Sequence, residues 1–237
     1  ALAWYGMAAF TAGDLPKANE LADQLLAESV RRSVHTRSHA FALKAMAAFG
    51  RGDWAVLATA SRNLRTLADE NADVGFCLLS GAVVGYGAAA GVLGGAPLPA
   101  DVDEQAKRQV DDSERVQAAL VMLPKVMAGN QDALSAGLRA YEPGLRLWDR
   151  NRVWDVADLI PAIALTVLEG WEELPRVLAR LDEFAAHGAR LPEAAAAAIR
   201  EEEAAAHGGL RPRHEQLQRL GYLGISELLH FRPGLGG

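Results

Sequence analysis

The chain has 237 residues, half of them hydrophobic, and its 30 acidic and 24 basic side chains leave a net charge of −6. This length suits one elongated domain or two small ones with a sizeable core. The charge balance lacks the basic face that is typical of nucleic-acid binding, and the single cysteine, Cys77, excludes an internal disulfide. We therefore predict a cytoplasmic protein that does not bind nucleic acid.

The first predicted unit is a pair of helices on either side of Gly13. An apolar run stops at Gly13, where glycine can adopt a left-handed helix cap without steric cost. Asp14 can cap the second helix, and Pro16 suits its first turn. Helical spacing follows in Ala18, Leu21, Ala22, Leu25 and Leu26.

The same pattern returns about 40 residues later, a spacing typical of helical repeats. The sequence "FTAGDLPKA" at 10–18 is echoed by "FGRGDWAVL" at 49–57, and similar glycines close apolar runs at Gly129 and Gly170. A further unit is expected to end near residue 91, in "AAAGVLGG". No segment alternates apolar and polar residues as a half-buried strand would. The sequence therefore predicts an all-α superhelix, a solenoid of about five helix–turn–helix units of about 40 residues each.

The third unit, residues 74–100, contains no charged residue and is rich in glycine. Its length could span a bilayer, but a helix buried by its neighbours explains the same composition, and we predict no membrane segment. The sequence "GYGAAAG" at 85–91 has the glycine spacing of a phosphate-binding loop. Such a loop needs strands around it, and none is predicted. We favour the interpretation that these glycines allow two helices to approach closely.

The later units are less regular. Pro124 falls inside a predicted first helix, which it should kink. Tryptophan and arginine mix in "RLWDRNRVWD" at 146–155, either as the junction of units four and five or as an interface. Residues 191–237 are expected to form capping helices and a tail that continue the repeats of residues 1–190 as one domain. The chain begins and ends within a pattern, so we expect a piece of a longer protein.

The first unit resembles a tetratricopeptide repeat, with Leu2, Tyr5, Gly6, Ala9, Gly13, Asp14, Leu15, Ala18, Ala22 and Leu25 at the helix-packing positions of that family. The segments "FGRGDWAVLATASRNL", "VVGYGAAAG" and "QRLGYLGISELLHFRP" are similar to the C-terminal helical repeats of bacterial class III adenylate or guanylate cyclases and of LuxR-type ATPase regulators. These resemblances imply a TPR-like, non-catalytic interaction or regulatory module of a bacterial signalling protein.

The tetratricopeptide correspondence implies a concave groove that binds a peptide, a partner helix or another part of the same chain. Its expected lining is Ala3, Met7, Phe10, Thr11, His39, Ala42, Met46, Phe49, Val116, Ala119, Leu123 and Met127. Such an apolar lining favours an amphipathic helix as the occupant. The occupant could be a partner, a second copy of the chain, or the C-terminal segment, residues 212–232, folded back.

Other candidate sites are weaker. Arg31, Arg32, His35 and Arg37 form a small basic patch, either a solvated turn or a contact for an acidic partner. The pairs His35/His39 and Glu203/His207 have the spacing of two metal ligands on one helix, but no third ligand is evident. We therefore predict no catalytic residue, metal or cofactor. The alternative function is an all-α enzyme or a domain that binds a small ligand or nucleotide through the glycine-rich residues 75–95.

Overall fold

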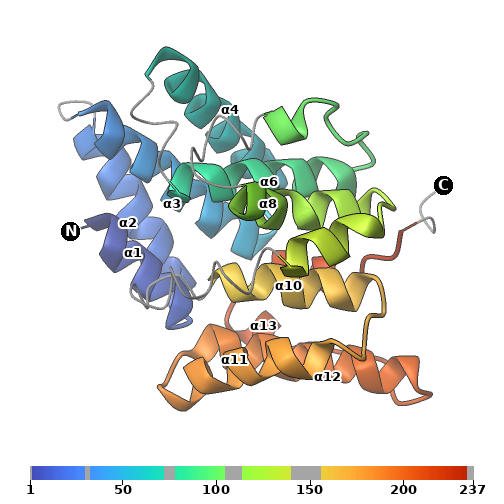
Figure 1. The fold of residues 1–237 in the computed structure, drawn as a ribbon. Coiled ribbons are helices and arrows are strands. Elements are labelled where there is room, and N and C mark those ends of the chain that lie inside the picture. Colours follow the sequence, from blue (N-terminus) through green and yellow to red (C-terminus); the bar gives the residue numbers. More distant parts are fainter. Residues whose placement is uncertain (1, 30–32, 72–77, 105–113, 140–155, 234–237) are drawn as a thin grey trace.

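The computed structural model describes residues 2–29, 33–71, 78–104, 114–139 and 156–233, and these residues form helices without any strand (Figure 1). The all-α prediction is therefore confirmed. The helices are α1 (Leu2–Thr11), α2 (Leu15–Ser29), α3 (Val34–Arg51), α4 (Trp54–Glu70), α6 (Leu78–Leu93), α8 (Glu114–Met127), α10 (Val156–Val167), α11 (Leu174–Ala186), α12 (Arg190–Ala206), α13 (Glu215–Arg219) and α14 (Leu223–Leu229). Residues 102–104 and 132–139 are also helical.

The turns that end the first helices share one chemistry. Gly13, Gly52, Gly95 and Gly129 all adopt positive φ, between 75° and 87°. After each turn a backbone N–H reaches back five residues, as in Asp14 N to Ala9 O at 2.9 Å and Asp53 N to Ala48 O at 2.9 Å. This closure satisfies carbonyl groups that the helix end leaves unpaired. The predicted glycine caps at these positions are confirmed.

The aspartates that follow two of these turns cap the next helices. The Asp14 side chain accepts a hydrogen bond from Lys17 N at 3.0 Å, and Asp53 accepts one from Val56 N at 3.3 Å. At the fifth unit the prediction was wrong by one residue, because Glu169 rather than Gly170 takes the left-handed conformation, with φ 55°. The closing bond, from Gly170 N to Leu165 O, has the same form.

Neighbouring helices pack in chain order, but the two ends of the chain also meet. Helices α1 to α4 pack successively, and α6 packs against α3, α4 and α8. Helix α10 lies between α8 and the pair α11 and α12 (Figure 1). In addition, α14 contacts α3, and α12 contacts α1. A repeat that touched only its neighbours would make neither of these last contacts.

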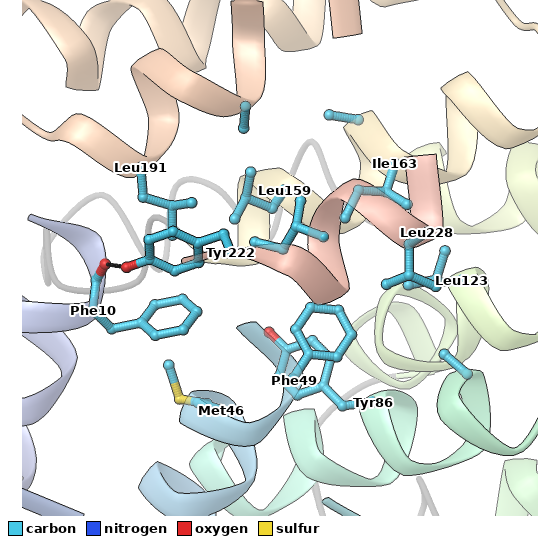
Figure 2. Close-up of a cluster of buried hydrophobic side chains, with 14 of the residues drawn as sticks. Phe10, Met46, Phe49, Tyr86, Leu123, Leu159, Ile163, Leu191, Tyr222 and Leu228 are labelled. Carbon is cyan, nitrogen blue, oxygen red and sulfur yellow. Dashed lines mark hydrogen bonds between the residues drawn. The ribbon is translucent and has the colours of Figure 1, made fainter. Parts of the chain in front are cut away.

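One hydrophobic core draws on the beginning, middle and end of the chain. Figure 2 shows Phe10 and Phe49 beside Tyr86, Leu159 and Tyr222, which come from five different segments. The rings of Phe49 and Tyr86 lie 4.4 Å apart between centroids, and those of Phe10 and Tyr222 lie 5.2 Å apart, edge to face. In the described part of the chain, no helix combines the length and apolar character that a bilayer span requires.

Candidate functional site

The structure places most of the predicted groove in the core. Met7, Phe10, Met46 and Phe49, together called the α1–α3 face below, are at most 3% exposed. Ala3, Thr11, Ala42, Leu123 and Met127 are also buried, and His39 is half-buried. The side chains of Val116 and Ala119 lie outside the described residues. The buried positions therefore form no open groove, and most of them share one core cluster with the C-terminal segment, residues 212–232.

Tyr222 anchors the C-terminal segment to α1. Its hydroxyl donates a hydrogen bond to the carbonyl oxygen of Phe10, and its ring packs edge-on against the Phe10 ring (Figure 2). The tyrosine is fully buried, and this burial raises the pKa of its hydroxyl well above the usual range. Ile225, Leu228 and Leu229 of α14 are also fully buried. Each such side chain stabilises the docked segment by about 1.5–3 kcal/mol.

Gly224 sets how closely α14 approaches α3. A Cβ atom built on Gly224 would lie 2.0 Å from the carbonyl oxygen of Phe49 and 2.6 Å from the amide nitrogen of Gly52. Backbone meets backbone here, so only glycine fits. Beside this contact, Trp54 Nε1 donates a hydrogen bond to Glu227 Oε2 at 3.1 Å. The second Gly–Asp turn is thus a docking point for the C-terminal segment.

The first Gly–Asp turn is covered by the same end of the chain. A Cβ on Gly13 would meet the Cβ of Arg190 at 2.9 Å and a methyl carbon of Leu220 at 3.4 Å. In contrast, a Cβ on Gly129, which closes the same kind of turn, would meet nothing within 4 Å. The repeated sequence at 10–18 and 49–57 therefore forms two turns that the later part of the chain packs against.

A buried polar cluster lies where the C-terminal segment meets α12. Glu202 Oε1 is 3.1 Å from His214 Nε2 and 3.7 Å from His230 Nε2, and Glu202 Oε2 accepts a hydrogen bond from Arg232 Nη2 at 2.8 Å. Ser226 Oγ is 3.0 Å from His214 Nδ1. Glu202 and His214 are 3% and 1% exposed. We call Glu202, His214, Ser226, His230 and Arg232 the polar cluster.

The charge of Glu202 is maintained by its neighbours. Burial raises the pKa of this carboxyl, but the contacts with His214 and Arg232 and the charge of His230 outweigh burial, so that the pKa lies below its usual value. Glu201 supports the same region, because its Oε2 accepts hydrogen bonds from the backbone N–H groups of Arg213 at 2.7 Å and His214 at 2.9 Å. His214 takes a left-handed conformation there, with φ 52°.

Ser226, His214 and Glu202 have the order of a serine-protease triad but not its accessibility. The histidine lies between a serine hydroxyl and a carboxylate, as in such a triad. However, Ser226 is 6% exposed and sits in the middle of α14. A nucleophile must reach its substrate, so this geometry argues for a structural role of the cluster rather than a hydrolytic one.

The remaining sequence candidates are not brought together. His35 is exposed and its ring lies 4.4 Å from that of His39, whose pKa is lowered to about 4 by burial and by the neighbouring His35. Arg37 is partly exposed, whereas Arg31, Arg32 and residues 146–155 lie outside the described residues. Residues 85–91 form part of α6 rather than a loop, and a Cβ on Gly87 would meet Ser61 Oγ of α4 at 2.8 Å.

Sequence reasoning missed the polar cluster. One signal was available: Glu202 falls at the helical spacing of the buried residues Leu191, Ala195 and Ile199 in α12. A carboxylate at a core position needs a partner. No local pattern, however, links it to His214 and His230, which reach it through the turns that begin α13 and end α14.

Comparison with known proteins identified no relative. The chain matches no family model, no curated protein and no solved structure.

Proposed function

We propose that this chain is a non-catalytic protein-interaction module, a TPR-like helical repeat of a cytoplasmic signalling protein. In this proposal the α1–α3 face is a helix-binding surface that holds the chain's own C-terminal segment. The observation that carries the proposal is the burial of Tyr222, Ile225, Leu228 and Leu229 against that face and its surroundings. An amphipathic helix seated in an apolar groove is a recurring mode of peptide recognition.

The contacts of the docked segment support a surface that recognises a helix by its backbone and by a few side chains. Gly224 brings the α14 backbone against the turn at Gly52, and Glu227 reaches Trp54 at the start of α4. Tyr222 binds the end of α1 through a hydrogen bond to the Phe10 carbonyl. These three contacts come from one short segment, and they involve the end of α1 and the turn between α3 and α4. A helix from a partner with a similarly placed glycine and aromatic residue could make the same contacts.

The alternative, a nucleotide site in the glycine-rich third unit, has less support. The glycines of residues 85–91 lie inside α6, where their amide groups belong to a helix rather than to a phosphate-binding turn. The close contact between Gly87 and Ser61 gives Gly87 a packing role.

The test cleaves the backbone before the C-terminal segment, so that the segment can leave its binding surface while no residue is deleted. Leu210 is 92% exposed between α12 and α13, so a protease site inserted after Leu210 should be cut without disturbing the fold. After cutting, a labelled peptide of residues 212–233 in excess should replace the resident segment, as measured by fluorescence anisotropy. The uncut chain should not bind the peptide, because its surface is occupied.

A matched peptide with Gly224→Val serves as the control. Its side chain would collide with the backbone at Phe49 and Gly52, so it should not exchange. If the cut chain keeps its helical circular dichroism but accepts neither peptide, or accepts both equally, the α1–α3 face is not a specific helix-binding surface. If the cut chain unfolds and excess peptide does not restore it, the segment is simply part of the core and the proposal fails.

A further inference from the structure

We propose that Glu202, His214 and His230 form a binding site for a divalent transition-metal ion, with Zn²⁺ as the best match. The three potential ligand atoms, one from each side chain, all lie within 4.8 Å of one another. Two histidine nitrogens and one carboxylate oxygen are a donor set that Zn²⁺ takes in proteins. The proposed site goes beyond the helix-binding surface described above, and two of its ligands, His214 and His230, belong to the C-terminal segment.

The distances suit a small tetrahedral ion. Zinc ligands at about 2.0–2.1 Å from the metal, arranged tetrahedrally, lie about 3.3 Å from one another. Glu202 Oε1 is 3.1 Å from His214 Nε2 and 3.7 Å from His230 Nε2. These two separations lie on either side of the zinc value, and all three ligand atoms lie within 4.8 Å of one another.

Two of the three ligand atoms are buried without a hydrogen-bond partner. Glu202 Oε1 and His214 Nε2 are close to each other, but neither atom has a hydrogen-bond partner among the described residues. Their side chains are 4% and 0% exposed. A buried polar group left in this state destabilises the fold. A cation between the two atoms would satisfy both.

Hydrogen bonds on the far side of each ring prepare the histidines as ligands. His230 Nδ1 lies 2.8 Å from the carbonyl oxygen of Ser226, which can only accept, so Nδ1 carries the proton and Nε2 of the neutral ring presents a lone pair. His214 Nδ1 is held by Ser226 Oγ at 3.0 Å. Metal-binding histidines are oriented by such partners on their other ring nitrogen.

The carboxylate is prepared in the same way. Arg232 Nη2 donates to Glu202 Oε2 at 2.8 Å and leaves Oε1 for the ion. The positive charge of Arg232 is shared with Glu169, whose Oε1 lies 3.7 Å from Arg232 Nε. The His230 side chain is 40% exposed, so the ion can enter from that side and keep a water molecule as its fourth ligand.

The rival explanation is an ion pair between Glu202 and a protonated His214, with no metal. Calorimetric titration of the EDTA-treated full chain with Zn²⁺ separates the two. The metal site predicts binding of one ion and a rise in the melting temperature, because an ion that binds only the folded chain stabilises it. Co²⁺ in place of Zn²⁺ should give the visible absorption of a tetrahedral site. An ion pair predicts neither binding nor any change in melting.

Variants assign the binding to these residues. His230→Gln should weaken Zn²⁺ binding by more than about tenfold. Substitution of a residue that only supports a metal ligand already weakens binding by about tenfold or more, and His230 is itself a proposed ligand. His187→Gln is the matched control. Like His230, His187 ends a helix and has its Nδ1 close to the carbonyl oxygen four residues back, Glu183 O at 2.7 Å. His187 lies outside the polar cluster. This variant should bind Zn²⁺ as the unmodified chain does.

Two results would overturn the assignment. One is the absence of Zn²⁺ binding to the unmodified, folded chain. The other is binding that survives His230→Gln but disappears in His35→Gln, which would place the ion at the exposed His35/His39 pair, whose rings are 4.4 Å apart. Circular dichroism of each variant verifies that lost binding does not reflect lost structure.

Discussion

At the scale of single residues, the packing of the helices depends on glycines whose surroundings leave no room for a Cβ atom. Gly224 is the extreme case, since its Cβ would overlap the backbone of Phe49 and Gly52, which cannot rotate away as a side chain can. Other glycines have open surroundings. Gly91 of α6 would place a Cβ 3.9 Å from its nearest neighbour, the Cβ of Ala96, which is ordinary contact. The two residues should therefore respond in opposite directions to the same substitution.

Gly224→Ala should lower the free energy of unfolding by about 1–3 kcal/mol, the usual cost of forcing an extra carbon into a packed site. Gly91→Ala should leave it unchanged or raise it by up to about 1 kcal/mol, because alanine favours the helix more than glycine does. Urea-induced unfolding measures both values. Equal effects of the two substitutions would mean that α14 does not approach α3 as closely as described.

His39 makes the stability of the chain depend on pH. Its pKa falls from 6.5 to about 4 on folding, chiefly through burial and then through His35. Between these values the unfolded chain binds a proton that the folded chain does not, so this residue lowers the stability as the pH falls through that window.

Replacing His39 by Gln should therefore reduce the loss of stability between pH 6.5 and pH 4. The free energy of unfolding is to be measured at several pH values for His39→Gln and for the control His187→Gln, whose histidine is exposed at the end of α11. The control should keep the original pH dependence. A His39 variant with that same dependence would show that the residue is not buried as described.

At the scale of elements, the same closed turn ends α1, α3, α6 and α8. The turns at Gly52 and Gly129 have nearly the same geometry, with φ 75° and 87°. They differ in surroundings, because a Cβ on Gly52 would meet Gly224 N at 3.2 Å whereas one on Gly129 would meet nothing within 4 Å. Substituting each glycine therefore separates the destabilisation caused by the left-handed conformation from that caused by contact with the C-terminal segment.

Gly129→Ala should destabilise the chain by about 1–2 kcal/mol, the price of a left-handed conformation for a residue with a Cβ. Gly52→Ala should cost more, because the added methyl group also presses on the backbone of α14. Thermal melts followed by far-UV circular dichroism compare the two. A Gly52 variant no less stable than the Gly129 variant would contradict the contact between α3 and α14.

The sequence was informative where the chemistry is local. Gly13 with Asp14 and Gly52 with Asp53 predict helix–turn–helix units, because the cap needs only neighbouring residues. Where the partner is distant in the chain, the sequence left alternatives open or gave no signal. Fold-back of residues 212–232 was one of three possible covers of the groove, but nothing near Phe10 selects Tyr222, and nothing near Glu202 indicates His230. The helical spacing of α1 and α3 marks an apolar face but does not state whether solvent, a partner or the same chain lies on it.

At the scale of the whole molecule, the C-terminal segment links early and late helices of the chain. It contacts α3, α10 and α12, while α12 itself contacts α1. The C-terminal segment thus contacts the beginning of the chain and, together with α2, α6 and α12, packs around α1 and α3. Stability should depend strongly on this short segment.

Deleting residues 212–237 should expose the α1–α3 face. Met7, Phe10, Met46 and Phe49 would add a contiguous apolar patch, which monomeric proteins seldom leave open. The truncated chain should bind a hydrophobic dye and aggregate or dimerise in size-exclusion chromatography, whereas the intact chain does neither. A control that removes only residues 234–237 should behave like the intact chain. A truncated chain that is monomeric and binds no dye would contradict the covering role of the segment.

The hydrogen bond between Tyr222 and Phe10 links residues 212 positions apart in the chain. A ribosome adds about 5–20 residues per second, so Phe10 waits about 10–40 s before Tyr222 is made. During this interval the nascent helices α1 and α3 have no C-terminal segment to cover them. Their apolar side chains are then available to chaperones or to neighbouring nascent chains. The order of synthesis therefore predicts that the nascent chain is most prone to aggregation just before α14 emerges.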